Sequence, residues 1–165
     1  MPGPVDRRAQ WSWAFYDWAN SAFATTVMAG FFPVFFKSYW AGDLSAVEST
    51  AQLGIANSLA SLLVVLLAPM LGVTADRAGR KKGLLVLLAV LGILMTAGLY
   101  LVAQGQWVLA AALYVLGIIG FAGGNVAYDA MLLEIARRDE LERLSARGFA
   151  LGYLGGGLLF AVNVA

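Results

Sequence analysis

Six polar side chains interrupt stretches of the sequence that are otherwise almost entirely apolar: Asp17, Asn20, Ser21, Thr25, Asn125 and Asp129. The spacing of the first four places them in one polar stripe along a single face of a helix. A carboxylate at the centre of a membrane span costs about 2.5–3.5 kcal/mol on insertion scales, so it seldom occurs there without a role. All six residues are therefore candidates for binding a small polar solute or a proton.

The two carboxylates also have structural interpretations. Asp17 would lie only about 9 Å along a helix that begins near Trp11, where a carboxylate favours the positive helix N-terminus. For this residue both interpretations stay open. Asp129 follows Asn125 by four residues and precedes Glu134 and several arginines. That position favours a paired carboxylate at a helix end over a binding residue.

The composition removes most other chemistry. The 165-residue chain has no Cys and no His, so it lacks a thiol nucleophile and the commonest metal ligand. It also lacks the sequence patterns of serine hydrolases, zinc proteases and phosphate-binding loops. Its basic residues lack the interleaved exposed aromatics typical of nucleic-acid-binding proteins. We expect neither an enzyme nor a nucleic-acid-binding protein, and neither a metal nor a cofactor.

Lipid is the expected solvent of the helices that would position these residues. The chain is 61% hydrophobic and 13% charged, whereas soluble domains are about 45–50% apolar and about 25% charged. Uncharged runs cover residues 18–36, 49–75, 83–128 and 148–165. The third run would reach roughly 69 Å as one helix, more than twice a hydrocarbon core of about 30 Å, so it must fold back near Gln104–Gln106.

These runs predict an all-α membrane protein, a polytopic helical bundle forming one transmembrane domain. The predicted spans are residues 13–37, 52–75, 84–103, 107–128 and 148–165, the fifth of them incomplete. With five spans, ten of the eleven Lys and Arg residues fall on one side of the membrane, and only Lys37 falls on the other. The positive-inside rule then predicts a cytoplasmic N-terminus.

The loop after the second span reads GVTADRAGRKK over residues 72–82. It resembles the signature between helices two and three of major facilitator superfamily transporters, with matches at Gly72, Asp76, Arg77, Gly79, Arg80 and Lys81. We expect Gly72 to allow two helices to approach, Gly79 to permit a tight turn, and Asp76 to meet basic partners or helix N-termini. The other interpretation is a basic turn that only fixes topology.

Two further segments narrow the resemblance. WAFYDWANSAF at 13–23 and RLSARGFALGYLGGGLL at 143–159 are similar to the vacuolar amino-acid effluxer-like branch of that superfamily. This chain departs from the branch at Asp129, where the family pattern has Asn, and at Leu133, where it has Pro.

The resemblance implies the N-terminal part of a secondary active transporter that moves a small solute, an amino acid by analogy, by alternating access. The whole protein would have twelve helices in two bundles, with inverted triplets in each. Its partners would be the lipid bilayer, a small-molecule substrate and the missing C-terminal half. The protein would be located in a bacterial inner membrane. Asp76 and its basic neighbours would help to lock the cytoplasmic gate. This chain is then expected to be a fragment.

Five glycines recur at four-residue spacing, in one pair and one triplet: Gly120, Gly124, Gly148, Gly152 and Gly156. Such spacing is typical of close helix packing in membranes. In transporters the same faces also allow helices to slide. It likewise supports an alternative function, a small non-transporting scaffold or assembly protein that binds other helices through its glycine faces.

Overall fold

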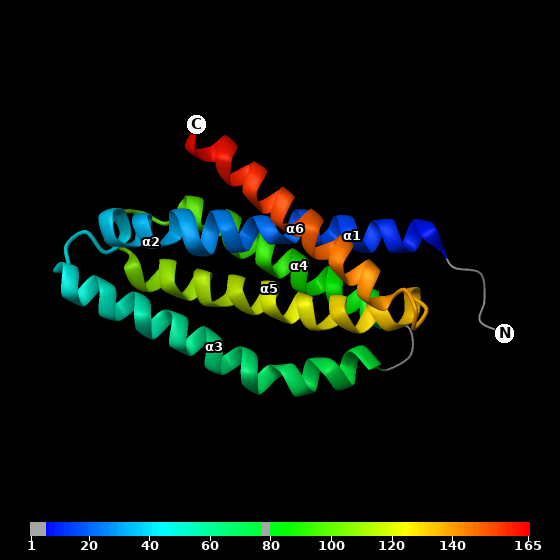
Figure 1. The fold of residues 1–165 in the computed structure, drawn as a ribbon. Helices are drawn as coiled ribbons and strands as arrows, with labels where there is room; N and C mark the ends of the chain where they lie inside the picture. The colour runs from blue at the N-terminus through cyan, green and yellow to red at the C-terminus, as the bar shows by residue number, and fades with distance from the viewer. Residues whose placement is uncertain (1–5, 77–79) are drawn as a thin grey trace.

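The computed structural model describes residues 6–76 and 80–165, and within these ranges it is helical with no strand. Five helical stretches are long and apolar enough to cross a membrane: Arg7–Trp40, Ala46–Asp76, Lys81–Leu101, Trp107–Ile135 and Leu141–Val164. They lie lengthwise beside one another, with the last crossing the first at an angle (Figure 1). The expected all-α membrane fold is confirmed.

The first stretch is not a uniform α-helix. α1 (Arg7–Ala22) is followed by η1 (Phe23–Phe31), α2 (Phe32–Phe35) and η2 (Phe36–Trp40). The two η segments are π-helical, with hydrogen bonds that reach back five residues, as from the Phe32 N–H to the Val27 carbonyl. At the start of α1, the Asp6 carboxylate accepts hydrogen bonds from two backbone N–H groups, which otherwise have no partner within a helix.

The remaining elements are α3 (Ala46–Asp76), α4 (Lys81–Gly98), η3 (Leu99–Leu101), α5 (Trp107–Ile135) and α6 (Leu141–Val164). α5 packs against both α3 and α4, while α6 packs mainly on α1. Between η3 and α5 the chain turns back at Gly105, whose φ of +81° is a conformation that glycine adopts without strain. This turn lies inside the long uncharged run of residues 83–128.

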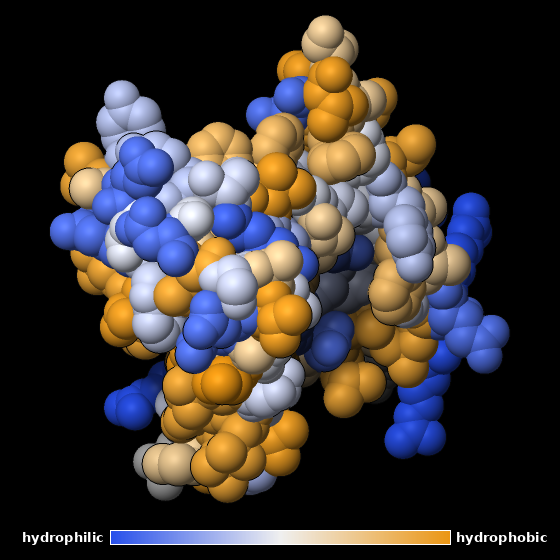
Figure 2. Space-filling view, turned by 90° about the vertical axis from the view of Figure 1, so that its left-hand side faces the viewer, coloured by the Kyte–Doolittle hydropathy of each residue, from blue (hydrophilic) through white to orange (hydrophobic). Residues whose placement is uncertain are grey.

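Aromatic side chains join α1 and its continuation to α5 along their length. Trp13 stacks on Tyr128 with ring centroids 4.1 Å apart, and Phe32 stacks on Tyr114 at 3.7 Å. The two stacks belong to separate apolar clusters at opposite ends of the bundle. Apolar residues also cover much of the outside, as expected for a surface in lipid (Figure 2).

Glycines allow the closest helix contacts. A Cβ added at Gly120 on α5 would lie 2.6 Å from the Gly92 backbone nitrogen and 2.7 Å from the Leu88 carbonyl oxygen, both on α4. At Gly124 an added Cβ would lie 3.1 Å from the Tyr16 hydroxyl. α5 therefore has no room for a side chain towards α4 at Gly120, because the neighbouring atoms there are backbone.

We predict that Gly120→Ala lowers the free energy of unfolding by about 1–3 kcal/mol, because α4 and α5 must move apart to admit the methyl group. This change in the free energy of unfolding can be measured by following the loss of helical circular dichroism as a denaturing detergent is added. Gly54→Ala is the matched control, since a Cβ at Gly54 in α3 meets no atom within 4 Å. Equal stability of the two variants would contradict the close packing of α4 on α5.

Candidate functional site

A hydrogen bond between two amides links α1 to α5 within their membrane spans. The Asn20 side-chain nitrogen donates to the Asn125 side-chain oxygen at 2.7 Å, and the Tyr16 hydroxyl lies 3.4 Å from the Asn20 oxygen. Two of the six polar candidates thus come together from positions 105 residues apart. Such a pair satisfies polar groups that lipid cannot hydrate.

The other three residues of the predicted stripe face α6. The Ser21 hydroxyl donates to Asp17 at 3.3 Å, and the Thr25 hydroxyl donates to the Gly156 carbonyl oxygen at 3.1 Å. A Cβ at Gly152 would lie 2.7 Å from the Ser21 hydroxyl and 2.8 Å from an Asp17 carboxylate oxygen. The predicted stripe therefore divides, with Asn20 turned to α5 and Asp17, Ser21 and Thr25 turned to the glycine face of α6.

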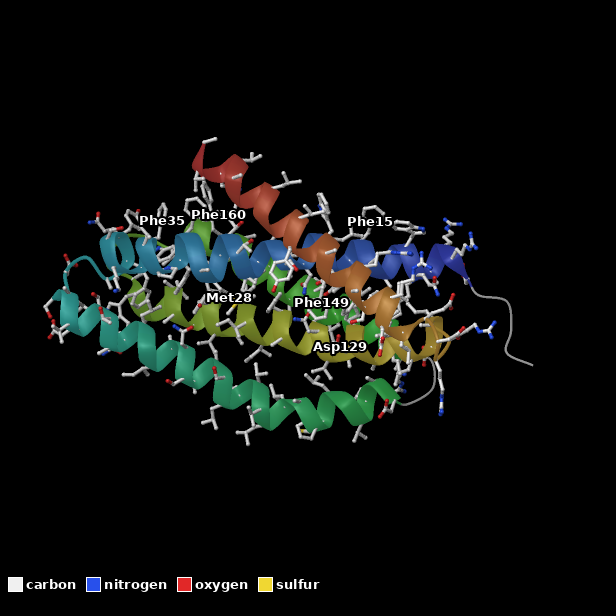
Figure 3. All side chains as sticks on the ribbon, viewed as in Figure 1. Phe15, Met28, Phe35, Asp129, Phe149 and Phe160 are labelled. Atoms are coloured by element: carbon white, nitrogen blue, oxygen red, sulfur yellow. The ribbon has the colours of Figure 1, made fainter. Side chains whose placement is uncertain are left out.

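Asp129 lies apart from this group. It is exposed, near the C-terminal end of α5 (Figure 3). In residues 6–76 and 80–165 it forms neither a hydrogen bond nor an ion pair, so the expected paired carboxylate is not observed. Glu134 pairs instead with Lys81, with 2.9 Å between nitrogen and oxygen.

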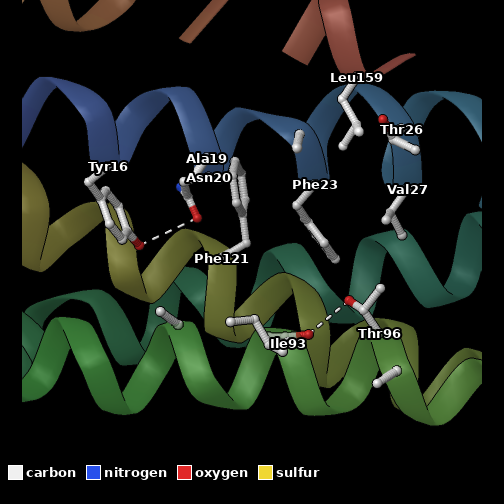
Figure 4. A pocket seen from close by; sticks show the side chains of 14 residues that line it. Tyr16, Ala19, Asn20, Phe23, Thr26, Val27, Ile93, Thr96, Phe121 and Leu159 are labelled. Carbon is white, nitrogen blue, oxygen red and sulfur yellow. Dashed lines mark hydrogen bonds between the residues drawn. The ribbon is translucent and has the colours of Figure 1, made fainter. Parts of the chain in front are cut away.

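A cavity of about 480 Å³ lies beside the amide pair, between the first stretch, α4 and α5 (Figure 4). Its lining is mainly apolar, with Asn20, Thr26 and Thr96 as polar exceptions besides Tyr16. The sequence pattern did not predict the contribution of α4, from Gly92, Ile93 and Thr96. The small residues Ala89, Gly92 and Ala97 of α4 could have indicated a cavity at this position, because small residues leave space between packed helices.

Trp13 and Tyr128 were also missed as partners of one another. The Trp13 ring nitrogen donates to the Tyr128 backbone carbonyl at 2.9 Å while the two rings stack with their planes 6° apart. Gly148 on α6 leaves room for both, since its added Cβ would lie 2.7 Å from the Trp13 ring and 2.9 Å from the Tyr128 hydroxyl. The aromatic motif at 13–23 is thus used largely for packing against α5 and α6.

The loop motif after α3 is described only in part. Arg77 and Gly79 lie outside the described residues, while Asp76 is exposed at the last position of α3 and Arg80 precedes α4. Lys81 donates to the Ala130 carbonyl at 3.0 Å in addition to its pair with Glu134, and so joins the start of α4 to the end of α5.

Gly72 has no close neighbour among the described residues. A Cβ added there would meet no atom within 4 Å, so no helix of the described chain approaches it closely. The expected close approach of a helix at Gly72 stays a prediction.

The sequence model of the family described as "Vacuole effluxer Atg22 like" matches residues 39–165. The chain belongs to this family. It is also 39% identical over 155 residues to the uncharacterized MFS-type transporter YxiO of Bacillus subtilis. The aligned region covers 93% of this chain and 36% of YxiO. The resemblance to the effluxer-like branch and to MFS-type transporters is therefore confirmed.

A second relative is the melibiose permease of Enterobacter cloacae, 33% identical over 151 residues, covering 83% of this chain and 34% of the permease. The effluxer-like chain thus spans about a third of the length of these two curated relatives. No solved structure matches it.

We predict that Asn20 and Asn125 are energetically coupled. Single changes to Ala should each destabilise the fold, and the double-mutant cycle should give a coupling energy of about 0.6 kcal/mol and at most about 1.7, the range for hydrogen bonds between membrane helices. Unfolding in mixed micelles measures it. Asn163 is the control partner, because it donates only within α6, to the Leu159 carbonyl. Additive effects of Asn20→Ala and Asn125→Ala would contradict the predicted coupling.

Proposed function

We propose that the chain is the N-terminal part of a secondary active transporter that moves a small solute by alternating access. The observation that carries the proposal is the set of polar side chains on α1 and α5 within apolar spans, beside a cavity of about 480 Å³. Polar groups are expensive in a membrane, and in helical bundles they mark solute and ion pathways. The similarity to MFS-type transporters supports the same function.

The division of the polar stripe suggests separate tasks. Asn20 and Asn125 carry neutral amides suited to hydrogen bonding a polar solute. Asn20 lines the cavity, and Asn125 is its hydrogen-bond partner. Asp17 is the only carboxylate within the apolar part of the first stretch and lies against α6. A carboxylate in this setting can exchange a proton when α6 moves, so we assign Asp17 to coupling and Asn20 and Asn125 to the solute.

An amino acid is the proposed substrate class, by the resemblance of segments 13–23 and 143–159 to the vacuolar amino-acid effluxer-like branch. The named substrate of one relative, melibiose, defines the competing class. We further propose that Asp76 and the basic residues after it form part of a cytoplasmic gate. In that arrangement Lys81 would hold the ends of α4 and α5 together through Glu134 and the Ala130 carbonyl.

The alternative of a non-transporting scaffold depends on glycine faces that are free to bind other helices. In the described chain Gly148, Gly152 and Gly156 already contact Trp13, Asp17, Ser21 and Thr25 of the first stretch. This occupied face weakens the scaffold interpretation and favours the transporter.

We predict that proteoliposomes containing the full-length protein take up labelled amino acids when a pH gradient is imposed, and that Asp17→Asn abolishes this coupled uptake without preventing membrane insertion. The amide keeps the size of the side chain but cannot carry a proton. Asp43→Asn, an exposed carboxylate in the loop before α3, is the control and should transport normally. Unchanged coupled uptake by Asp17→Asn would exclude the coupling role, and uptake of melibiose alone would exclude the amino-acid class.

We also propose a cytoplasmic N-terminus in a bacterial inner membrane, and the lack of Cys makes this testable. A membrane-impermeant maleimide should label Asp43→Cys in intact cells and should label Lys82→Cys only after permeabilisation, because the two positions lie at opposite ends of the bundle. Both side chains are exposed. The reverse labelling pattern would contradict the orientation.

A further inference from the structure

A basic pocket lies where α1 and α6 begin, at the opposite end of the bundle from α2. It encloses about 310 Å³ and is lined by Arg7, Gln10, Trp11, Glu140, Arg143, Leu144 and Arg147. Three guanidinium groups meet there with a single carboxylate, and the first turns of two helices add their positive ends. The proposed transport site does not use this pocket.

The arginines of the pocket form no ion pair with any acid of the described residues. The ion pairs within residues 6–76 and 80–165 are Lys81 with Glu134 and Arg137 with Asp139, both formed by residues outside the pocket lining. The Arg147 guanidinium lies 4.9 Å from the centroid of the Trp11 ring. This cation–π contact orients the guanidinium and leaves its charge uncompensated, so the pocket has a net positive charge.

The walls of the pocket are held in place by the rest of the fold. Gln10 is buried, and its side-chain nitrogen donates to the Ile135 carbonyl at 3.1 Å, which ties the start of α1 to the end of α5. Leu144 is also buried, in the same apolar cluster as Trp13 and Tyr128. Two lining residues are therefore anchored in the packed part of the fold, and the arginines project from the adjoining turns of α1 and α6.

The chemistry of the lining selects a phosphate group. The planar guanidinium fork matches the oxygens of phosphate and donates two parallel hydrogen bonds to them. Basic pockets between membrane helices on the cytoplasmic side bind phosphorylated lipid headgroups by this means. A free phosphate ion would meet the same arginines, so the surroundings of the pocket must distinguish the two sources.

An apolar strip beside the pocket favours a lipid. Trp11 and Phe15 are 46% and 54% exposed, one turn apart on α1, with ring centroids 5.9 Å apart. Figure 3 shows Phe15 on the outer side of α1, away from α5. The strip starts at the pocket and runs towards the middle of α1, where the acyl chain of a bound lipid would lie. A free phosphate ion would make no contact with this strip, so the strip favours a lipid.

We propose that the pocket formed by Arg7, Arg143 and Arg147 binds the headgroup of an anionic phospholipid, with an acyl chain along Trp11 and Phe15. The lipid would lie against both α1 and α6. In the proposed orientation, a lipid in this position would hold α1 and α6, the two helices that meet at Asp17, together at their cytoplasmic ends.

Native mass spectrometry of the full chain in a neutral detergent tests the proposal. Phosphatidylglycerol should remain bound in preference to phosphatidylcholine. Each arginine near an anionic lipid is worth about fivefold in affinity, so Arg143→Gln with Arg147→Gln should weaken phosphatidylglycerol binding by about 25-fold. If this double variant loses helical circular dichroism, Arg143→Gln alone, which changes an exposed side chain, should weaken binding by about fivefold.

Lys82→Gln with Arg138→Gln is the matched control, because it removes two exposed positive charges outside the pocket. Its phosphatidylglycerol binding should stay close to that of the unchanged protein. An equal loss in the control would show general attraction to a basic surface and overturn the proposal. Equal retention of phosphatidylcholine would overturn it too, as would displacement of phosphatidylglycerol by inorganic phosphate at a similar concentration, which would indicate a free-anion site.

Discussion

Polar groups inside a membrane must find their partners within the protein, because hydrocarbon offers no hydrogen bonds. This constraint explains why every span is helical and why several of its side-chain hydroxyls bond to neighbouring carbonyls. Thr96 donates to the Gly92 carbonyl at 2.8 Å and Thr74 to the Met70 carbonyl at 2.8 Å, each one turn back in its own helix. Asn20 and Asn125 are different, since each satisfies the other from a separate helix. This hydrogen bond favours the arrangement of α1 along α5 in which Asn20 lies beside Asn125.

The second condition of the fold is that backbones come close where side chains are absent. Gly120 brings α5 against α4, and Gly152 and Gly156 bring α6 against Asp17, Ser21 and Thr25. In lipid the apolar surface of a helix gains little by turning from lipid to protein, so close packing and hydrogen bonds must stabilise the bundle. The Thr25 hydroxyl bonded to the Gly156 carbonyl combines the two conditions, because only a residue without a side chain leaves that carbonyl within reach.

The helical membrane fold could be predicted from the sequence because every span crosses the same bilayer. Each span must therefore be apolar over its length, and most charges must lie outside it. The sequence did not predict which face of α1 meets which neighbour. The four-residue spacing joins Asp17, Asn20, Ser21 and Thr25 in one stripe, yet α1 lies between α5 and α6 and divides that stripe between them. Pairs such as Trp13 with Tyr128 and Lys81 with Glu134 join residues from distant parts of the chain. Such contacts depend on helix crossing angles, which local periodicity does not contain.

The position of α1 has a consequence for motion. α6 packs mainly on α1, and α3 and α4 pack on α5, so α1 and its continuation to Trp40 are the main link between the two groups of helices. On one side the link is an amide pair with stacked aromatics, which is geometrically specific. On the other side it is a glycine face packed closely against Asp17 and two hydroxyls. Asp17 lies within the α1–α6 contact, so any movement of α6 against α1 would change the surroundings of this carboxylate.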